Sequence, residues 1–328
     1  MPKSAPGSEP ARHLIIPFAG RGTPGCRAII AELRLPRLER LMTRMQPLQD
    51  DMQEETTFSP PHERALAAAL GLPVQDGRIP WAALQARQLG LPEAPAGHGW
   101  GRLDLCHWHV GIDDVALGDP RTLTVDAAES ATLLALLTPF FAEDGIALHA
   151  GGHPGQWLAS GALFDTLATA SVDRAAGQPI SEWSPLADAG RPLRRLQNET
   201  QMLLYTNPLN DARAERGLPP INSFWASGTG ALPTVVRPVD PAPETDERLR
   251  MPALLDDAPG WAMAWRSLDE DVVAPLLAAL ESGADVRLTL CGDRIARTFG
   301  PRTGGGIGAL ARRLFERAPA PVDVLGAL

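Results

Sequence analysis

An apolar run near the beginning of the chain ends in a glycine-rich turn and leads into a helical pattern. Residues 14–20 (LIIPFAG) predict a buried strand, residues 20–25 predict the turn, and apolar side chains then recur at helical spacing. Near the other end, residues 286–291 (VRLTLC) predict a second strand with alternating apolar side chains. Alternation of strands and helices at both ends predicts an α/β fold.

The composition is that of an ordinary globular protein. The chain has 328 residues, 44% hydrophobic and 21% charged, so it can bury a substantial core in one large domain or two smaller ones. The formal net charge of -9 argues against nucleic-acid binding, which needs clustered Lys and Arg. No run approaches the ~20 apolar residues of a membrane span. The three isolated cysteines predict neither disulfides nor a zinc knuckle. We therefore expect a cytoplasmic protein that binds neither nucleic acid nor membrane.

Turn-rich and polar stretches suggest how the chain is divided. Residues 1–13 lack an apolar core and predict a disordered tail, and the stretch 91–101 (LPEAPAGHGWG) predicts a linker. We expect an α/β core that begins in residues 14–100 and continues in residues 196–328. An inserted α+β subdomain is expected in residues 101–195.

Some local elements follow from single residues. Asp126 and Glu129 match a capping box and predict the start of a helix. Pro275 predicts a kink or split in the helical pattern around it. The polar, acidic stretch 46–59 predicts a solvated loop, and the glycine-rich stretch 303–309 predicts a flexible one.

The most specific stretch is residues 198–230 (NETQMLLYTNPLNDARAERGLPPINSFWASGTG). It places asparagines, an arginine and glycines beside prolines that fix the backbone. Asn offers donors and acceptors together, and Arg offers a planar fork suited to carboxylate or phosphate. An ordinary helix–loop–strand connection uses the same residue types. The composition alone therefore leaves both a polar site and a simple connection open.

The spacing within this stretch closely resembles a segment of archaeal-type cofactor-independent phosphoglycerate mutases. The matching positions are Pro208, Asn210, Arg213, Gly217, Pro220, Asn222, Trp225, Gly228 and Gly230. Asn207 stands where that family usually has His, and Ile221 where it usually has Ala.

The chain as a whole looks more like a bacterial branch of that group, the RpfE-type regulatory proteins. This resemblance rests on RRLQNETQMLLYTNPLND, NSFWASGTG and the CHW and CGDR segments, and it covers most of the chain. It implies an alkaline-phosphatase-like or phosphoglycerate-mutase-like mixed sheet flanked by helices, with an inserted α+β region.

The chain departs from the family pattern where metal-dependent relatives hold metal. In those relatives the first strand ends in an Asp, whereas here it ends in FAG at residues 18–20. In active mutases a later strand ends in an Asp-His pair, whereas here Arg294 follows Asp293. Arg cannot ligate a cation and could bind an anion directly. The comparison therefore implies a degenerate metal site.

A separate metal hypothesis rests on a His-x-His pair. Residues 103–110 predict a strand on which His107 and His109 share one face, with Asp113 and Asp114 just beyond. Imidazole and carboxylate suit divalent metals such as Mn or Zn. Because no full ligand set has a recognised spacing, we favour hydrogen-bonded histidines in a polar cleft or at a sheet edge.

Three functions remain open. We favour a phosphoglycerate-mutase-like regulatory or binding protein without a cofactor, which takes a small anionic or phosphorylated ligand or a protein partner. The alternative is an active 2,3-bisphosphoglycerate-independent phosphoglycerate mutase or a metal-dependent phosphohydrolase that uses Mn or Zn. In the third interpretation, the cluster of Asn210, Arg213 and Asn222 has only a structural role and stabilises a turn. The candidate ligand-binding residues are Asn207, Asn210, Arg213, Asn222, Asp293 and Arg294.

Overall fold

The computed structural model describes residues 12–185, 188–236, 238–302 and 320–328. The chain divides into two compact units: unit 1 takes residues 1–55, 61–71 and 237–328, and unit 2 takes residues 56–60 and 72–236. The predicted loop at 303–309 lies outside the described residues. Of the helices in the described ranges, none is both long and apolar enough to cross a membrane.

This division differs from the predicted one. The insert was expected to end at residue 195, whereas unit 2 continues to residue 236 and contains the whole stretch 198–230. The reason is strand β8 (Ser223–Gly230), which pairs antiparallel with β3 (Gly99–Cys106). The motif stretch therefore completes the sheet of unit 2. At the other end, Arg12 and His13 belong to the first strand rather than to a tail.

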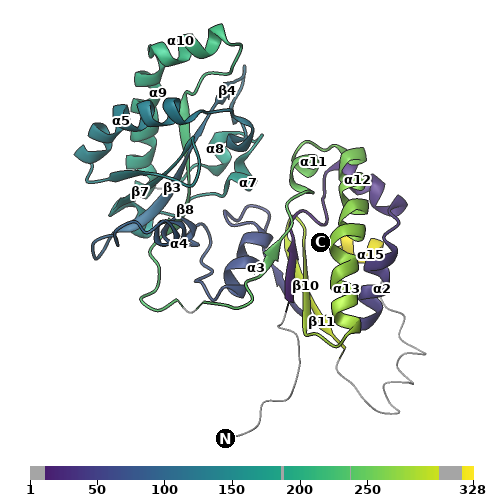
Figure 1. Ribbon diagram of the computed structural model, residues 1–328. Helices are drawn as coiled ribbons and strands as arrows, with labels where there is room; N and C mark the ends of the chain where they lie inside the picture. The colour runs from purple at the N-terminus through teal and green to yellow at the C-terminus, as the bar shows by residue number, and fades with distance from the viewer. Residues whose placement is uncertain (1–11, 186–187, 237, 303–319) are drawn as a thin grey trace, which may run out of the picture. The chain divides into compact units, whose positions relative to one another are not determined.

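Unit 1 is built on a mixed five-stranded sheet of order β2–β11–β10–β1–β9 (Figure 1). Strand β1 runs parallel to β10 and β9, while β11 is antiparallel to β10 and β2. The prediction of an α/β fold with a mixed sheet flanked by helices is confirmed. The strands are β1 (Arg12–Ile16), β2 (Met45–Met52), β9 (Glu244–Thr245), β10 (Val286–Cys291) and β11 (Ile295–Pro301).

Helices cover both faces of this sheet. Because side chains alternate along β1, Leu14 and Ile16 enter a large core with most of the helices, whereas Ile15 packs near Ala65 and Leu66 of α3 on the other face. The helices are α1 (Pro24–Ile29), η1 (Ile30–Glu32), α2 (Pro36–Arg44), α3 (Pro61–Ala69), α11 (Arg250–Leu254), α12 (Ala258–Leu268), η4 (Asp269–Val273), α13 (Ala274–Glu281) and α15 (Pro321–Gly326).

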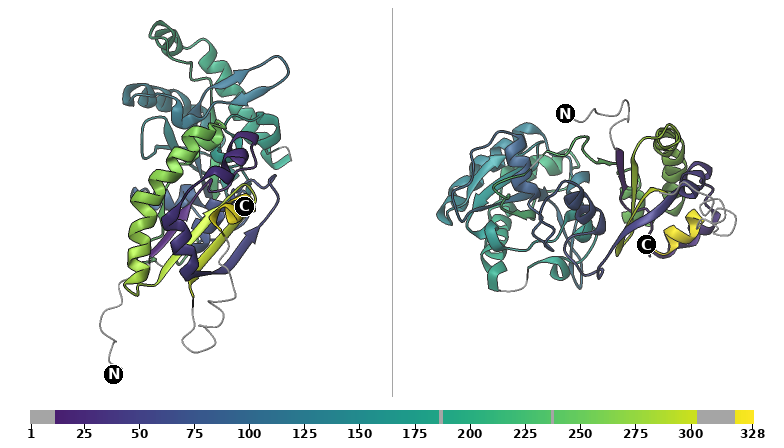
Figure 2. Two further views of the ribbon diagram at one scale, coloured as in Figure 1. Left: turned by 90° about the vertical axis from the view of Figure 1, so that its right-hand side faces the viewer. Right: turned by 90° about the horizontal axis from the view of Figure 1, so that it is seen from below.

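The predicted interruption at Pro275 is confirmed. Figures 1 and 2 show α12 and α13 following one another along one side of the sheet, and the turn between them, Asp269–Val273, is π-helical. Proline has no N–H to offer the carbonyl four residues before it, so the regular hydrogen-bond ladder cannot continue there. Within this turn, the buried Asp269 accepts hydrogen bonds from the backbone N–H groups of Arg37 (3.1 Å) and Leu38 (2.7 Å). This capping of α2 ties the two halves of unit 1 together.

The predicted solvated loop at residues 46–59 is wrong for its first half. Residues 45–52 form β2, an edge strand antiparallel to β11. Its Asp50 carboxylate accepts from Arg297 on β11, with Oδ2 2.7 Å from Nη2. An edge strand exposes side chains on both faces and tolerates charge, which is why its composition resembles that of a loop.

Unit 2 contains an antiparallel four-stranded sheet of order β6–β7–β3–β8 and a separate hairpin, β4–β5. One face of the sheet packs its apolar residues against α5 and α9, the other against α4. The strands besides β3 and β8 are β4 (Trp108–Val110), β5 (Val115–Leu117), β6 (Ala147–Ala150) and β7 (Gln156–Gly161). The helices are α4 (Trp81–Gln88), η2 (Pro120–Thr122), α5 (Ala127–Glu143), α6 (Leu163–Thr166), α7 (Val172–Ala175), α8 (Ile180–Trp183), η3 (Asp188–Gly190), α9 (Arg191–Tyr205) and α10 (Pro208–Glu215).

Candidate functional site

Asn207 and Gly217 mark the two ends of helix α10. Asn207 is the N-cap: its side-chain oxygen accepts from the backbone N–H of Leu209 at 3.0 Å, and Pro208 occupies the first turn. Gly217 follows the helix in the left-handed region, with φ at 69°, where glycine meets no steric penalty. Both motif residues therefore have a local structural role.

The Asn210 side chain is fully engaged with the backbone. Its amide nitrogen donates to the carbonyl oxygens of Leu204 (3.0 Å) and Ile221 (2.8 Å), and its oxygen accepts from the N–H of Ile221 (2.9 Å). These bonds tie the end of α9 to the segment before β8. Nothing in this arrangement points the amide at a ligand.

Asn222 makes a similar two-way connection. Its side-chain oxygen accepts from the N–H of Trp108 at 2.7 Å, and its amide nitrogen donates to the carbonyl of Trp108 at 3.0 Å. A side-chain amide can take the place of a backbone peptide in such a pair. Asn222 thus holds the start of β4 beside the start of β8.

Arg213 is completely buried, with 0% of its surface exposed. Its Nη1 lies 2.8 Å from Oε2 of Glu129, and its Nε donates to the carbonyl of Pro219 at 2.8 Å. Arg216 donates to the other Glu129 oxygen. The remaining Nη2 of Arg213 has no hydrogen-bond acceptor among the described residues. Arg213 is therefore sealed in the interior and joins α10 to α5.

Glu129 belongs to the predicted capping box, which is confirmed: Asp126 accepts from the N–H of Glu129, and Glu129 accepts from the N–H of Asp126. Burial raises the pKa of Glu129, but the Asp126 N–H and the two arginines outweigh it, so the net pKa is lowered. One carboxylate thus caps α5 and anchors α10.

Asp293 and Arg294 lie in unit 1, in the turn between β10 and β11, whereas the asparagines and Arg213 lie in unit 2. The carboxylate of Asp293 accepts from the N–H of Gly22 at 2.7 Å and forms an ion pair with Arg21. Arg294 lies 3.5 Å from Oε1 of Glu54. Because β1 and β10 are parallel, Asp293 meets the turn after β1 at their common carboxyl edge.

The His-x-His stretch does not form one strand. Strand β3 ends at Cys106 and β4 begins at Trp108, yet the rings of His107 and His109 remain close, with centroids 4.4 Å apart. Nδ1 of His107 lies 2.9 Å from the carbonyl of Pro220; since a carbonyl can only accept, this nitrogen donates. Burial lowers the pKa of His107, an effect that the Pro220 hydrogen bond opposes.

Asp113 and Asp114 lie in the exposed turn between β4 and β5. Within the described ranges, no group of three or more His, Cys, Asp or Glu side chains is arranged to hold a metal ion.

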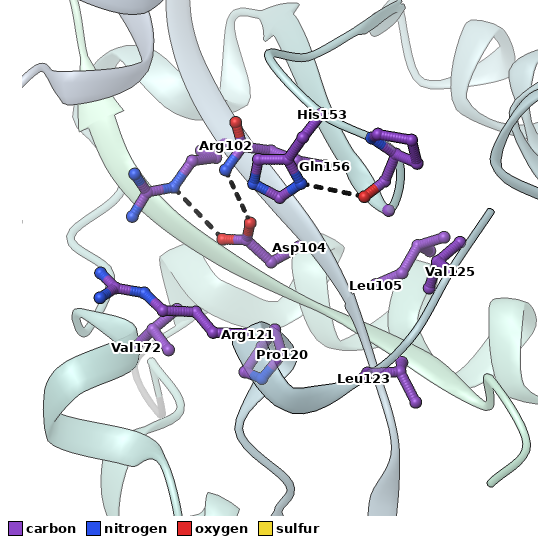
Figure 3. A pocket seen from close by; sticks show the side chains of 12 residues that line it. Arg102, Asp104, Leu105, Pro120, Arg121, Leu123, Val125, His153, Gln156 and Val172 are labelled. Carbon is purple, nitrogen blue, oxygen red and sulfur yellow. Dashed lines mark hydrogen bonds and ion pairs between the residues drawn. The ribbon is translucent and has the colours of Figure 1, made fainter. Parts of the chain in front are cut away.

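A pocket of about 260 Å³ lies beside β3 in unit 2 (Figure 3). Its polar side is formed by Arg102 and Asp104 of β3, Gln156 of β7, Arg121 and His153. Residues 102 and 104 project to the same side of the strand because they are two apart. Apolar side chains complete the lining, among them Leu105, Leu123, Val125 and Val172.

A chain of hydrogen bonds fixes the polar side of this pocket. Gln85 of α4 donates to the Gln156 side-chain oxygen at 2.6 Å, and the Gln156 nitrogen donates to Oδ1 of Asp104 at 3.0 Å. Nε of Arg102 lies 3.2 Å from Oδ2 of Asp104, and its Nη2 donates to the hydroxyl of Ser227 at 3.2 Å. Nε of Arg102 and Oδ2 of Asp104 are close enough to form an ion pair. They do not form a hydrogen bond, because neither of these two atoms has a hydrogen-bond partner among the described residues.

Most of this pocket could not be predicted from the sequence. Two charged residues at alternate positions of an otherwise apolar strand, Arg102 and Asp104, were the available signal. Arg121 and Gln156 carried no comparable signal, because an arginine in a loop and a glutamine at the start of a strand are common. The fold alone brings them together.

Solved structures that are similar to this chain include two of low sequence identity. No family model matches the chain, and no curated protein matches it. The PH0037 protein from Pyrococcus horikoshii is 10% identical, with a TM-score of 0.44 over 90% of this chain and 88% of that one. A cofactor-independent phosphoglycerate mutase from Thermoplasma acidophilum is 13% identical, with a TM-score of 0.38 over 90% of each chain. With both TM-scores below 0.5, neither likeness assigns an activity to this chain.

Proposed function

We propose that the protein is a binding protein for a small anionic ligand, and that the ligand occupies the pocket beside β3. The observation that carries this proposal is the pair of guanidinium groups, Arg102 and Arg121, on the wall of one small cavity. Guanidinium groups bind carboxylate and phosphate through paired, charge-assisted hydrogen bonds.

Arg102 is held in place before any ligand arrives. Its contacts to Asp104 and Ser227 use Nε and Nη2, whereas Nη1 makes no hydrogen bond to any described residue. A pre-positioned cation loses little conformational entropy on binding, and this favours affinity. The hydrogen-bond chain from Gln85 through Gln156 fixes the Asp104 carboxylate, against which Arg102 lies.

Arg121 gives the pocket a second, more accessible cation. Its side chain is 43% exposed, and its Nη2 lies 3.9 Å from the buried carboxylate of Asp173. The volume of about 260 Å³ is slightly below the ~300–1,000 Å³ of typical ligand pockets. The pocket therefore suits a metabolite rather than a nucleotide or a peptide.

The regulatory part of the proposal rests on the sequence. We assign the chain the role of a phosphoglycerate-mutase-like, RpfE-type regulatory protein whose metal chemistry has been lost. The Arg21 guanidinium against Asp293 supports that loss, because it puts positive charge at the carboxyl edge where relatives hold a cation. Anion binding by the Asp293–Arg294 turn itself stays a prediction.

The test is a titration of the purified chain with inorganic phosphate, 3-phosphoglycerate and small carboxylates, followed by calorimetry and thermal melting. At least one of these anions should raise the melting temperature. Arg121→Gln should weaken its binding about tenfold or more. The matched control is Arg87→Gln, an exposed arginine on α4 outside the pocket, which should bind like the parent.

Two results would count against the proposal. If no anion binds at millimolar concentration, or if Arg121→Gln binds as tightly as the parent, the pocket is not an anion site. Turnover of 3-phosphoglycerate after addition of manganese would contradict the loss of metal chemistry and support the enzyme alternative.

A further inference from the structure

We infer that the ligand of the pocket beside β3 is a small zwitterion, an α-amino acid with a short apolar side chain. This inference rests on the proposed anion site and adds two recognition elements to it. One is a buried carboxylate that would receive the ammonium group, and the other is an apolar wall that would receive the side chain.

The pocket carries both signs of charge at close range. Arg102 and Asp104 lie two residues apart on one strand, and Arg121 lies near Asp173. Arg102, Arg121 and Asp104 line the pocket, and the Asp173 carboxylate lies 3.9 Å from Nη2 of Arg121. A site for a phosphate or a dianion would leave such carboxylates facing like charge, which is repulsive. A ligand that itself carries a carboxylate and an ammonium matches both signs.

Asp104 has one oxygen, Oδ2, that lies 3.2 Å from Nε of Arg102 but accepts no hydrogen bond from any described residue. The residue is 7% exposed, and its Oδ1 accepts from Gln156. A buried carboxylate oxygen without a donor is unfavourable. An ammonium group supplies three donors that can rotate into place, so it would give Oδ2 a hydrogen-bond donor.

The Gln85–Gln156 chain presents a hydrogen-bond donor to Asp104. Gln156 must present its nitrogen to Asp104, because its oxygen already accepts from Gln85. Oδ1 of Asp104 accepts from this nitrogen. The oxygen left for a cationic donor is therefore Oδ2.

The opposite wall suits a short hydrocarbon. Leu123, Val125 and Val172 line the pocket, and Figure 3 shows Leu123 and Val125 apart from the charged group at Arg102 and Asp104. Leu123 and Val125 thus form an apolar part of the lining away from Arg102 and Asp104, whereas Val172 lies beside Arg121. A cavity of about 260 Å³ leaves little room beyond a branched aliphatic side chain.

The experiment compares four probes that share one hydrocarbon: L-leucine, 4-methylpentanoate, leucinamide and isoamylamine. Each is titrated into the full chain by calorimetry at pH 7.5. Leucine should bind at least about tenfold more tightly than 4-methylpentanoate, which lacks the ammonium, and than leucinamide, which lacks the carboxylate. Isoamylamine should not bind measurably.

A variant tests the role assigned to Asp104. Asp104→Asn keeps the shape of the side chain but removes its charge, so the preference for leucine over 4-methylpentanoate should fall to about threefold or less. Should this variant not fold, the probe panel on the parent still decides the inference.

The outcomes separate the two proposals. Equal affinity for leucine and 4-methylpentanoate, or tighter binding of phosphate than of leucine, overturns the amino-acid assignment and leaves the anion site standing. Failure of every carboxylate and phosphate to bind overturns both.

Discussion

The motif cluster (Asn207, Asn210, Arg213 and Asn222) and the pocket beside β3 use the same kinds of residue in opposite ways. In the motif cluster the asparagines bond to backbone groups and Arg213 is 0% exposed. In the pocket, Arg121 is 43% exposed at its side chain and one oxygen of Asp104 has no hydrogen-bond donor in the described part of the chain.

Residue type alone therefore does not distinguish a structural cluster from a ligand-binding site. The distinction lies in whether the polar side-chain atoms form hydrogen bonds to the protein's own backbone or line an open pocket. Asparagine is effective as a brace because one amide satisfies a backbone donor and a backbone acceptor together. The turns of the motif stretch require these particular residues for their backbone hydrogen bonds. This structural requirement holds whether or not a ligand binds.

The largest effect expected from this contrast is on Arg213. Arg213→Leu removes the buried partner of Glu129 and should lower the free energy of unfolding by about 3–5 kcal/mol, measured by urea denaturation. Arg216→Leu is the matched control, since Arg216 binds the same carboxylate from a half-exposed position, and it should cost about 1 kcal/mol. A small stability change for Arg213→Leu together with lost ligand binding would reverse the assignment.

The next effect is on Asn210. Asn210→Ala removes three hydrogen bonds to the backbone of Leu204 and Ile221 and should cost about 2–3 kcal/mol of unfolding free energy. Asn198→Ala, an exposed asparagine on the preceding helix, should change stability by less than about 0.5 kcal/mol. If the two substitutions lower the free energy of unfolding equally, the Asn210 hydrogen bonds make no specific contribution to stability.

A smaller, pH-dependent effect is expected in unit 1. His13 contacts the hydroxyl of Thr289 at 2.8 Å, which in turn contacts Thr298 at 2.8 Å. Burial, with the charge of Arg287, lowers the pKa of His13 to about 4. Below pH ~6.5 the unfolded chain therefore takes up a proton before the folded one does.

Stability should consequently fall as the pH drops from about 6.5 to about 4, and this contribution should then level off. His13 is only partly buried, so we expect on the order of 1 kcal/mol. Carboxylates such as Glu129 also titrate as the pH falls, so the quantity to measure is the difference between the parent and His13→Gln in denaturation series at pH 7 and pH 4.5. If the parent and His13→Gln differ by the same unfolding free energy at pH 7 and at pH 4.5, His13 makes no pH-dependent contribution to stability.

Local features were predictable from the sequence where one residue decides the geometry. The capping box at Asp126 and the interruption before Pro275 are of this kind, because a cap or a missing N–H acts within one helical turn. The α/β class followed from the apolar runs of β1 and β10. Strand β2 was missed because an exposed edge strand carries a loop-like composition.

Neither the motif cluster's contacts nor the pocket beside β3 was predictable, because both are made by residues that are distant in sequence. Arg213 and Glu129 are 84 residues apart, and Gln85 and Gln156 are 71 residues apart. The register of β3 against β7 and β8 places Gln156 beside Asp104 and Ser227 beside Arg102. The rings of His107 and His109 lie close together, with centroids 4.4 Å apart. The strand predicted over residues 103–110, however, is interrupted at His107, whose ring bonds to Pro220.

The most direct test of the contrast is one calorimetric titration, with leucine and 4-methylpentanoate, of two variants that should both fold. Arg121→Gln changes the pocket, and Asn207→Ala removes only the N-cap of α10, at about 1 kcal/mol of stability. The account predicts binding weakened about tenfold or more by Arg121→Gln and a dissociation constant within about twofold of the parent for Asn207→Ala. Binding lost in Asn207→Ala and retained in Arg121→Gln would contradict it and make the motif cluster the ligand site.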